Sequence, residues 1–179
     1  MQKADLETLP FADYSLFIKG QRAIIAGGEV HPWRLPVPAL WQDLTQKIKA
    51  ASFNTVSIYV NWALVNPKRG VTDWTGYRDL QPFIDFCRQS GLWLILRPGP
   101  HIQAEASAGG IAYWALGIEG ELRTNATDYR EAWSQYIAEV AEIARRNQVT
   151  EGGPIIAVQI ENEVRRADFP RLTHTFPRD

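Results

Sequence analysis

The sequence has only one cysteine, three histidines and a formal net charge of −1 in 179 residues. The single cysteine, Cys87, excludes an internal disulfide, and the scattered histidines do not have zinc-ligand spacing. The balance of acids and bases gives no sign of a nucleic-acid or membrane partner. No apolar run approaches the roughly 20 residues of a membrane span. The acidic N-terminal residues, with no apolar stretch, predict no signal peptide.

Motifs for nucleotides and for serine hydrolases are also lacking. No Gly-x-Gly-x-x-Gly or Walker pattern opens a helix, which argues against nucleotide binding. No Gly-x-Ser-x-Gly elbow occurs. The composition, 45% hydrophobic and 22% charged, is that of a soluble globular domain. We expect a protein that needs no metal and no cofactor.

Strand and helix patterns alternate along the chain. A hairpin is predicted over residues 15–26, with arms 15–18 and 23–26, and its second arm runs on into Gly27-Gly28-Glu29. Helices are then predicted over 38–51, 80–90 and 129–147, and strands over 55–60, 92–96 and within 152–163. Apolar strands of this kind predict an α/β fold with a parallel sheet covered on both faces. Four such steps are about half of an eight-stranded barrel.

Polar and aromatic side chains follow each predicted strand. They are Glu29, His31, Trp33 and Arg34 after the first strand, Tyr59, Asn61 and Trp62 after the second, Arg97, His101, Gln103 and Glu105 after the third, and Glu161, Asn162 and Glu163 after the fourth. In a barrel these strand ends meet in one pocket. Carboxylates and amides bind hydroxyls, and aromatic faces pack on sugar rings. Glycoside cleavage, which uses two carboxyls and no cofactor, fits best.

Four stretches resemble the signature of glycoside hydrolase family 35, the β-galactosidases. They are residues 28–36, 57–62, 97–105 and 152–163. Parts of the stretch between Gly109 and Thr127 are similar to the fungal branch in particular. The resemblance covers residues 14–163. It implies that residues 1–163 form the N-terminal half of a TIM (β/α)8 catalytic barrel, truncated after four βα steps.

The resemblance also implies roles for single residues. The family removes terminal β-D-galactose with retention, so a β-galactoside is the implied substrate, and Glu163 takes the place of the general acid/base. The implied substrate-binding residues are Tyr59, Gln103, Ala104, Glu105 and Asn162. The family's nucleophile is a second glutamate on a later strand, and no residue here corresponds to it. The chain alone is therefore expected to have little or no activity. Family members are mostly secreted or lysosomal.

From Val164 to Asp179 the sequence departs from the family, and its bases and prolines without periodicity predict a disordered tail. Two alternatives to the enzyme stay open. One is a non-catalytic galactoside-binding fragment, in which two copies could associate through the open barrel edges. The other is a related barrel glycosidase for another sugar, such as an exo-glucosaminidase or a β-glucosidase, because an Asn-Glu strand ending is common to many barrel glycosidases.

Overall fold

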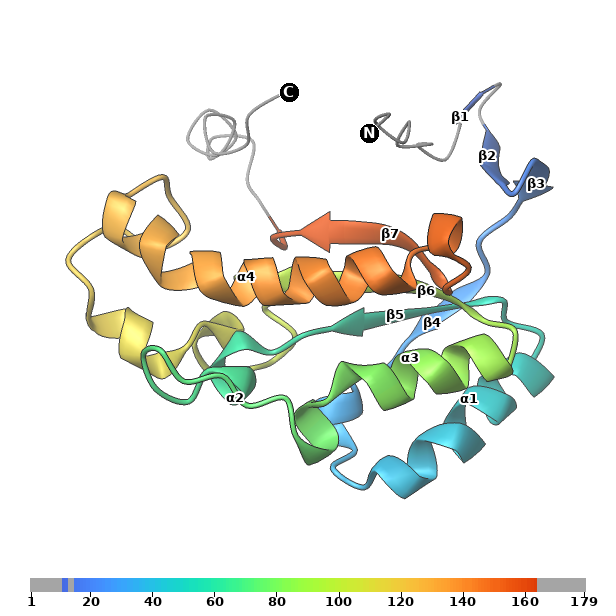
Figure 1. The fold of residues 1–179 in the computed structure, drawn as a ribbon, viewed down its shortest axis with the longest axis horizontal. Helices are drawn as coiled ribbons and strands as arrows, with labels where there is room; N and C mark the ends of the chain where they lie inside the picture. Colours follow the sequence, from blue (N-terminus) through green and yellow to red (C-terminus); the bar gives the residue numbers. More distant parts are fainter. Residues whose placement is uncertain (1–10, 13–14, 164–179) are drawn as a thin grey trace, which may run out of the picture.

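The computed structural model describes residues 11–12 and 15–163 and contains two sheets (Figure 1). The antiparallel sheet consists of β1 (Phe11–Ala12), β2 (Ser15–Ile18) and β3 (Gln21–Ala23). The parallel sheet has the order β4 (Gly27–Glu29), β5 (Thr55–Tyr59), β6 (Trp93–Gly99) and β7 (Ile155–Ile160). The helices are α1 (Trp41–Ala50), α2 (Trp62–Val65), α3 (Leu80–Gln89) and α4 (Thr127–Asn147).

The four parallel strands follow one another in the sheet in chain order. Gly27 pairs with Thr55, and Thr55 pairs with Trp93. Leu94 in turn pairs with Ile155. Helices intervene between successive strands, and α1, α3 and α4 run alongside the sheet (Figure 1). Neighbouring parallel strands joined by helices are the repeating unit of an eight-stranded barrel. The fold is therefore α/β and corresponds to the first half of a TIM barrel, as predicted.

The core lies between one face of the sheet and the helices. Val56, Ile58, Leu94 and Leu96 alternate along β5 and β6 and are buried against helix residues such as Phe83. The residues between them, among them Ser57 and Ile95, are only partly buried. The prediction of a sheet covered on both faces is thus wrong for the described residues. In a barrel the second face lines the interior, so its apolar residues do not require a second helical layer.

The predicted hairpin is correct in its first arm and wrong in its second. Strand β3 ends at Ala23, and Ile24 is 82% exposed despite its apolar character. The cause is Asn54, whose Nδ2 donates to the carbonyl of Ile24 (2.7 Å) and whose Oδ1 accepts from the backbone N–H of Ala26 (2.9 Å). Residues 24–26 are thereby tied to the start of β5. They lead the chain into β4, which belongs to the parallel sheet.

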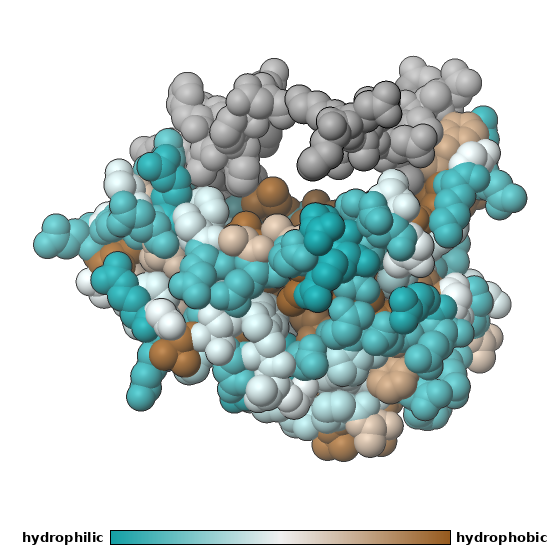
Figure 2. All heavy atoms as spheres, in the orientation of Figure 1, coloured by the Kyte–Doolittle hydropathy of each residue, from teal (hydrophilic) through white to brown (hydrophobic). Residues whose placement is uncertain are grey.

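Strands β4 and β7 are the two edges of the parallel sheet in the part of the chain that is described. Val158 and Ile160 on β7 are 47% and 48% exposed. Association of two copies through these edges stays a prediction. The face of the molecule that carries α4 is mainly hydrophilic, with scattered apolar patches (Figure 2). Within the described ranges, no helix combines the length and apolar character that a membrane span requires. The predicted tail, 164–179, lies outside the described residues.

The Gly152-Gly153-Pro154 sequence before β7 has a steric cause. Gly152 has φ +82°, a left-handed conformation that favours glycine. Gly153 packs against the end of α4 so closely that a Cβ at this position would overlap the backbone of Asn147. Its N–H donates to the carbonyl of Gln148 (2.9 Å). The two glycines let the chain turn back directly from α4 into β7.

Gly153→Ala is accordingly expected to lower the free energy of unfolding by at least about 2 kcal/mol, because the methyl group would meet rigid backbone. The matched control is Gly28→Ala, since a Cβ at Gly28 would meet nothing within 4 Å. Urea unfolding followed by circular dichroism measures both. Equal midpoints for the two variants would contradict the steric account.

Candidate active site

The strand ends of β5, β6 and β7 bring the predicted site residues to one edge of the sheet. Tyr59, the last residue of β5, is the register partner of Arg97 on β6. The N–H of Glu161 donates to the carbonyl of Gly99 (2.9 Å) and extends the pairing of β7 by one residue. Asn162 follows immediately. Because carboxyl ends of parallel strands face the same way, these side chains share one site.

The side-chain oxygen of Asn162 accepts three hydrogen bonds. The hydroxyl of Tyr59 donates at 3.0 Å, the guanidinium of Arg97 at 2.9 Å and the amide of Gln159 at 3.2 Å. A carbonyl oxygen has two lone pairs, so this oxygen has no acceptor capacity left. The positive Arg97 also decides which way the amide is oriented, because an NH2 group cannot face a guanidinium. The amide nitrogen of Asn162 is therefore the group that this residue offers to a ligand.

Arg97 links the ends of three strands. Its guanidinium lies 3.8 Å from the centre of the Tyr59 ring, a cation–π contact. It also forms an ion pair with Glu29 at the end of β4. Glu29 in turn lies 3.3 Å from the imidazole of His31. Together with the bond to Asn162, these contacts hold five of the predicted residues in one network.

Aromatic rings form one wall of the site. The indole N–H of Trp33 donates to the carbonyl of Tyr59 (3.0 Å), and the ring of His31 stacks on Trp33 with a centroid distance of 5.2 Å and an interplanar angle of 5°. Tyr59, Ile102 and Ala104 are buried together against Trp33. Ala104 is thus brought to Tyr59, and the substrate-binding role of both residues stays a prediction.

The loop after β6 has an unusual backbone. Gln103, Ala104 and Glu105 have φ values of +57°, +42° and +46°, which non-glycine residues adopt rarely. Arg34 holds this loop by donating to the carbonyl of Ala104 and to the carboxylate of Glu105, the latter at 3.4 Å. The side chains of Gln103 and Glu105 are exposed at the rim. No contact among the described residues joins them to Asn162.

The charge of Glu163 acts on its neighbours. Burial raises the pKa of Tyr59, the positive Arg97 opposes this shift, and the carboxylates of Glu29 and Glu163 add to it. Burial and Arg123 lower the pKa of His101, while Glu161 and Glu163 oppose the change. The side chain of Glu163 is exposed and forms no ion pair with any residue that the structure describes.

Two residues of the site were not predicted as site residues. Gln159, on β7, donates to the carbonyl of Glu161 (3.1 Å) as well as to Asn162. Arg123 donates to the carboxylate of Glu161 (3.0 Å) and to the carbonyl of Asn162 (2.7 Å). Arg123 lies in the stretch that resembles the fungal branch, and this resemblance was the signal that could have identified it.

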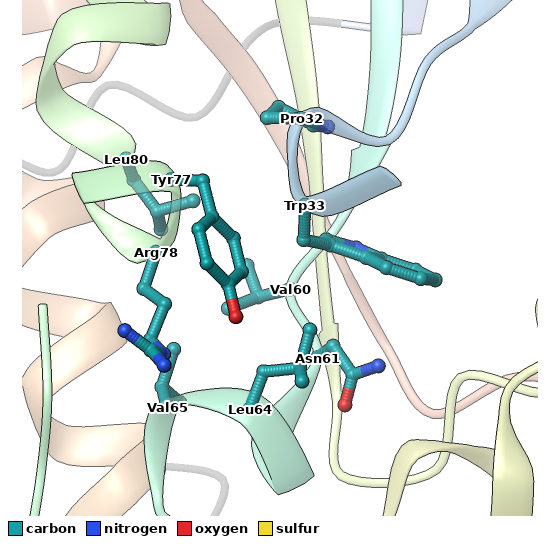
Figure 3. A pocket seen from close by; sticks show the side chains of 9 residues that line it. All are labelled: Pro32, Trp33, Val60, Asn61, Leu64, Val65, Tyr77, Arg78 and Leu80. Carbon is teal, nitrogen blue, oxygen red and sulfur yellow. The ribbon is translucent and has the colours of Figure 1, made fainter. Parts of the chain in front are cut away.

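A separate small cavity of about 10 Å³ lies beside this site (Figure 3). Its lining is mainly apolar and consists of Pro32, Trp33, Val60, Asn61, Leu64, Val65, Tyr77, Arg78 and Leu80. The indole of Trp33 turns away from it (Figure 3). A space of this size holds one water molecule and no sugar ring. Within residues 11–12 and 15–163, no cluster of three or more His, Cys, Asp or Glu side chains could hold a metal ion.

The fold and the strand-end site define the class of protein. An exo-β-1,4-mannosidase from Opitutaceae bacterium strain TAV5 superimposes with a TM-score of 0.65 over 81% of this chain and 26% of its own, at 18% identity. That likeness shows the fold. A half barrel with carboxylates, an amide and aromatic rings at its carboxyl edge has the residue types that barrel glycoside hydrolases use.

The family follows from sequence similarity. The model of Glycosyl hydrolases family 35 matches residues 15–173, and the chain belongs to this family. It is 51% identical over 149 residues to the probable β-galactosidase A of Neosartorya fischeri, covering 83% of this chain and 15% of that relative. The probable β-galactosidase E of Aspergillus fumigatus is 48% identical over 165 residues, which is 88% of this chain and 16% of that protein.

Proposed function

We propose that residues 15–163 carry the acid/base part of the active site of a retaining β-galactosidase, with Glu163 as the general acid/base. The observation that carries this proposal is the place of Glu163. It directly follows the immobilised Asn162 at the carboxyl end of β7, and it is unpaired among the described residues. The other acids of the site, Glu29, Glu105 and Glu161, are all paired with arginines.

The chemistry has two steps. First, the carboxylic acid of Glu163 donates its proton to the glycosidic oxygen while a nucleophilic carboxylate forms a bond to the anomeric carbon and the leaving alcohol departs. Then the Glu163 carboxylate removes a proton from water as the water oxygen attacks the anomeric carbon and releases the enzyme carboxylate. Glu163 ends each cycle protonated, as it began.

The remaining predicted residues bind the sugar. The amide nitrogen of Asn162 donates to a hydroxyl oxygen of galactose near C2, a contact that strengthens in the transition state. Tyr59 and Ala104 form the wall beside it, and Gln103 and Glu105 contact the sugar from the rim. These assignments rest on the resemblance to the family and on the shared strand edge.

We place the nucleophile outside residues 15–163. In a retaining enzyme the two carboxyl groups lie about 5–5.5 Å apart with free oxygens facing the sugar. Glu29 uses its carboxylate for Arg97 and His31, and Glu161 uses both oxygens for Arg123 and the N–H of His101. Glu105 pairs with Arg34 at the exposed rim, so none of the three is free to attack a substrate.

The 179-residue chain alone is expected to release no 4-nitrophenol from 4-nitrophenyl β-galactoside. When residues 15–163 replace the matching segment of the Neosartorya fischeri relative, this grafted enzyme is expected to hydrolyse that substrate. 4-Nitrophenyl β-glucoside tests whether the grafted enzyme prefers galactose. Equal rates of hydrolysis of the galactoside and the glucoside would point to a barrel glycosidase of other specificity. Hydrolysis by the chain alone that Glu163→Gln abolishes would contradict the placement of the nucleophile. A grafted enzyme that binds galactose without hydrolysis would favour a binding module.

A further inference from the structure

The backbone around Asn162 is held in an unusual conformation. Glu161 has φ +60° and Glu163 has φ +51°, so both neighbours of Asn162 lie in the left-handed region. Such values cost non-glycine residues free energy and persist only where surrounding contacts impose them. Arg123 supplies two of the contacts that hold this segment, one to Glu161 and one to Asn162.

Arg123 donates hydrogen bonds to two adjacent residues. Its Nε donates to one carboxylate oxygen of Glu161 (3.0 Å), and its Nη2 donates to the backbone carbonyl of Asn162 (2.7 Å). The planar guanidinium fixes the angle between these two bonds, which an ammonium group could not do. The other oxygen of Glu161 accepts the N–H of His101 (2.9 Å). Glu161 is 8% exposed, and both of its oxygens are thus satisfied.

The carbonyl that Arg123 binds belongs to the peptide group that joins Asn162 to Glu163. A planar peptide places this oxygen, the N–H of Glu163 and its Cα in one plane. Fixing the oxygen therefore fixes the N–Cα bond of Glu163, and the φ of +51° about this bond then sets the direction of the side chain. The side chain of Asn162 is held separately, by Tyr59, Arg97 and Gln159.

We propose that Arg123 is the positioning residue of the acid/base Glu163, acting through the Asn162 carbonyl. The proposal rests on the proposed role of Glu163. The residue that transfers the proton and the residue that binds the sugar are then each oriented by a different arginine. Arg123 orients the acid, and Arg97 orients the amide that binds the sugar.

The test is the dependence of rate on the leaving group in the grafted enzyme. A dinitrophenolate leaves without a proton, whereas the glucose of lactose needs one. Arg123→Gln is expected to lower kcat/KM for lactose about 10- to 100-fold more than for dinitrophenyl β-galactoside, a part of what an acid catalyst contributes. Arg123→Lys is expected to show a smaller loss of the same kind.

The matched control is Arg78→Gln. Arg78 is 27% exposed and pairs with Asp73 at 2.9 Å, while Arg123 is 32% exposed, so both substitutions remove an arginine of similar exposure from an ion pair. The control is expected to change kcat/KM for both substrates by the same factor. If both Arg123 variants also lower kcat/KM for the two substrates by the same factor, the arginine is merely structural and the proposal is wrong. If Glu163→Gln itself leaves the leaving-group dependence unchanged, the proposed role of Glu163 fails, and with it this one.

A second readout uses the 179-residue chain. The ¹⁵N shift of a backbone amide responds to hydrogen bonding at the preceding carbonyl, so the Glu163 amide reports the contact of Arg123 with Asn162. Arg123→Gln is expected to move the signals of Glu163 and His101, and Arg78→Gln is expected to leave them in place. Unmoved Glu163 and His101 signals in Arg123→Gln would overturn the proposed linkage.

Discussion

Glu163→Gln in the grafted enzyme is expected to lower kcat/KM for lactose by about 10³-fold, within the range that general acid–base catalysis contributes. Glutamine keeps the size of the side chain and removes the proton that the leaving oxygen needs. The loss for the first step of dinitrophenyl β-galactoside is expected to be small, because that leaving group departs unprotonated. The values of kcat/KM for both substrates measure the difference between these losses. A burst of dinitrophenol would show that the first step stays fast.

Azide separates an acid/base from a residue that only binds. Azide needs no general base, so its nitrogen can attack the anomeric carbon of the galactosyl-enzyme and release the enzyme carboxylate. The expected product with Glu163→Gln is β-galactosyl azide, detected by mass spectrometry. Glu131→Gln, an exposed acid on α4, is the control and is expected to form none. Equal losses on both substrates without an azide product would assign the acid/base to another residue.

Trp62→Ala is expected to lower the free energy of unfolding by about 3–5 kcal/mol, the usual effect of removing a buried tryptophan. Trp62 is fully buried at the start of α2. It stacks on Tyr136 at 5.7 Å and 18° and meets Trp114 edge-on at 5.8 Å and 84°. The large cavity left between α2 and α4 could not close, because both neighbours are rings of fixed shape.

Two variants sharpen this prediction. Trp62→Phe keeps an aromatic ring and removes an indole N–H that is buried without a hydrogen-bond partner among the described residues, so its effect is expected to be small. Tyr113→Ala removes a ring that is 58% exposed and is expected to change stability little. Urea unfolding followed by circular dichroism compares the three. A Trp62→Ala midpoint close to that of Tyr113→Ala would show that this cluster does not support the sheet.

Much of the fold could be predicted because its strands are short and apolar and its helices show helical spacing. Strand β5 and helix α3 lie within one residue of their predicted bounds. The second hairpin arm failed because Asn54 diverts residues 24–26, and a single distant amide leaves no pattern in the segment that it binds. Strand β6 runs on to Gly99, three residues beyond its predicted end at residue 96.

The site could be predicted in part for a similar reason. Tyr59 and Asn162 stand at strand ends, and parallel strands bring such residues together, here into a direct hydrogen bond. Arg123 could not be found in this way. It lies in a loop without periodicity and meets Glu161 across 38 residues of sequence. Contacts of that kind depend on how the loop packs.

The three donors on the oxygen of Asn162 have a consequence for how a sugar would bind. The amide is oriented before any ligand arrives, so its rotational freedom is lost during folding and not during binding. Little reorganisation is then required in the transition state, when the charge on the sugar ring develops. A site of this kind would act as a rigid template, and the backbone of its bound and free forms would be nearly the same.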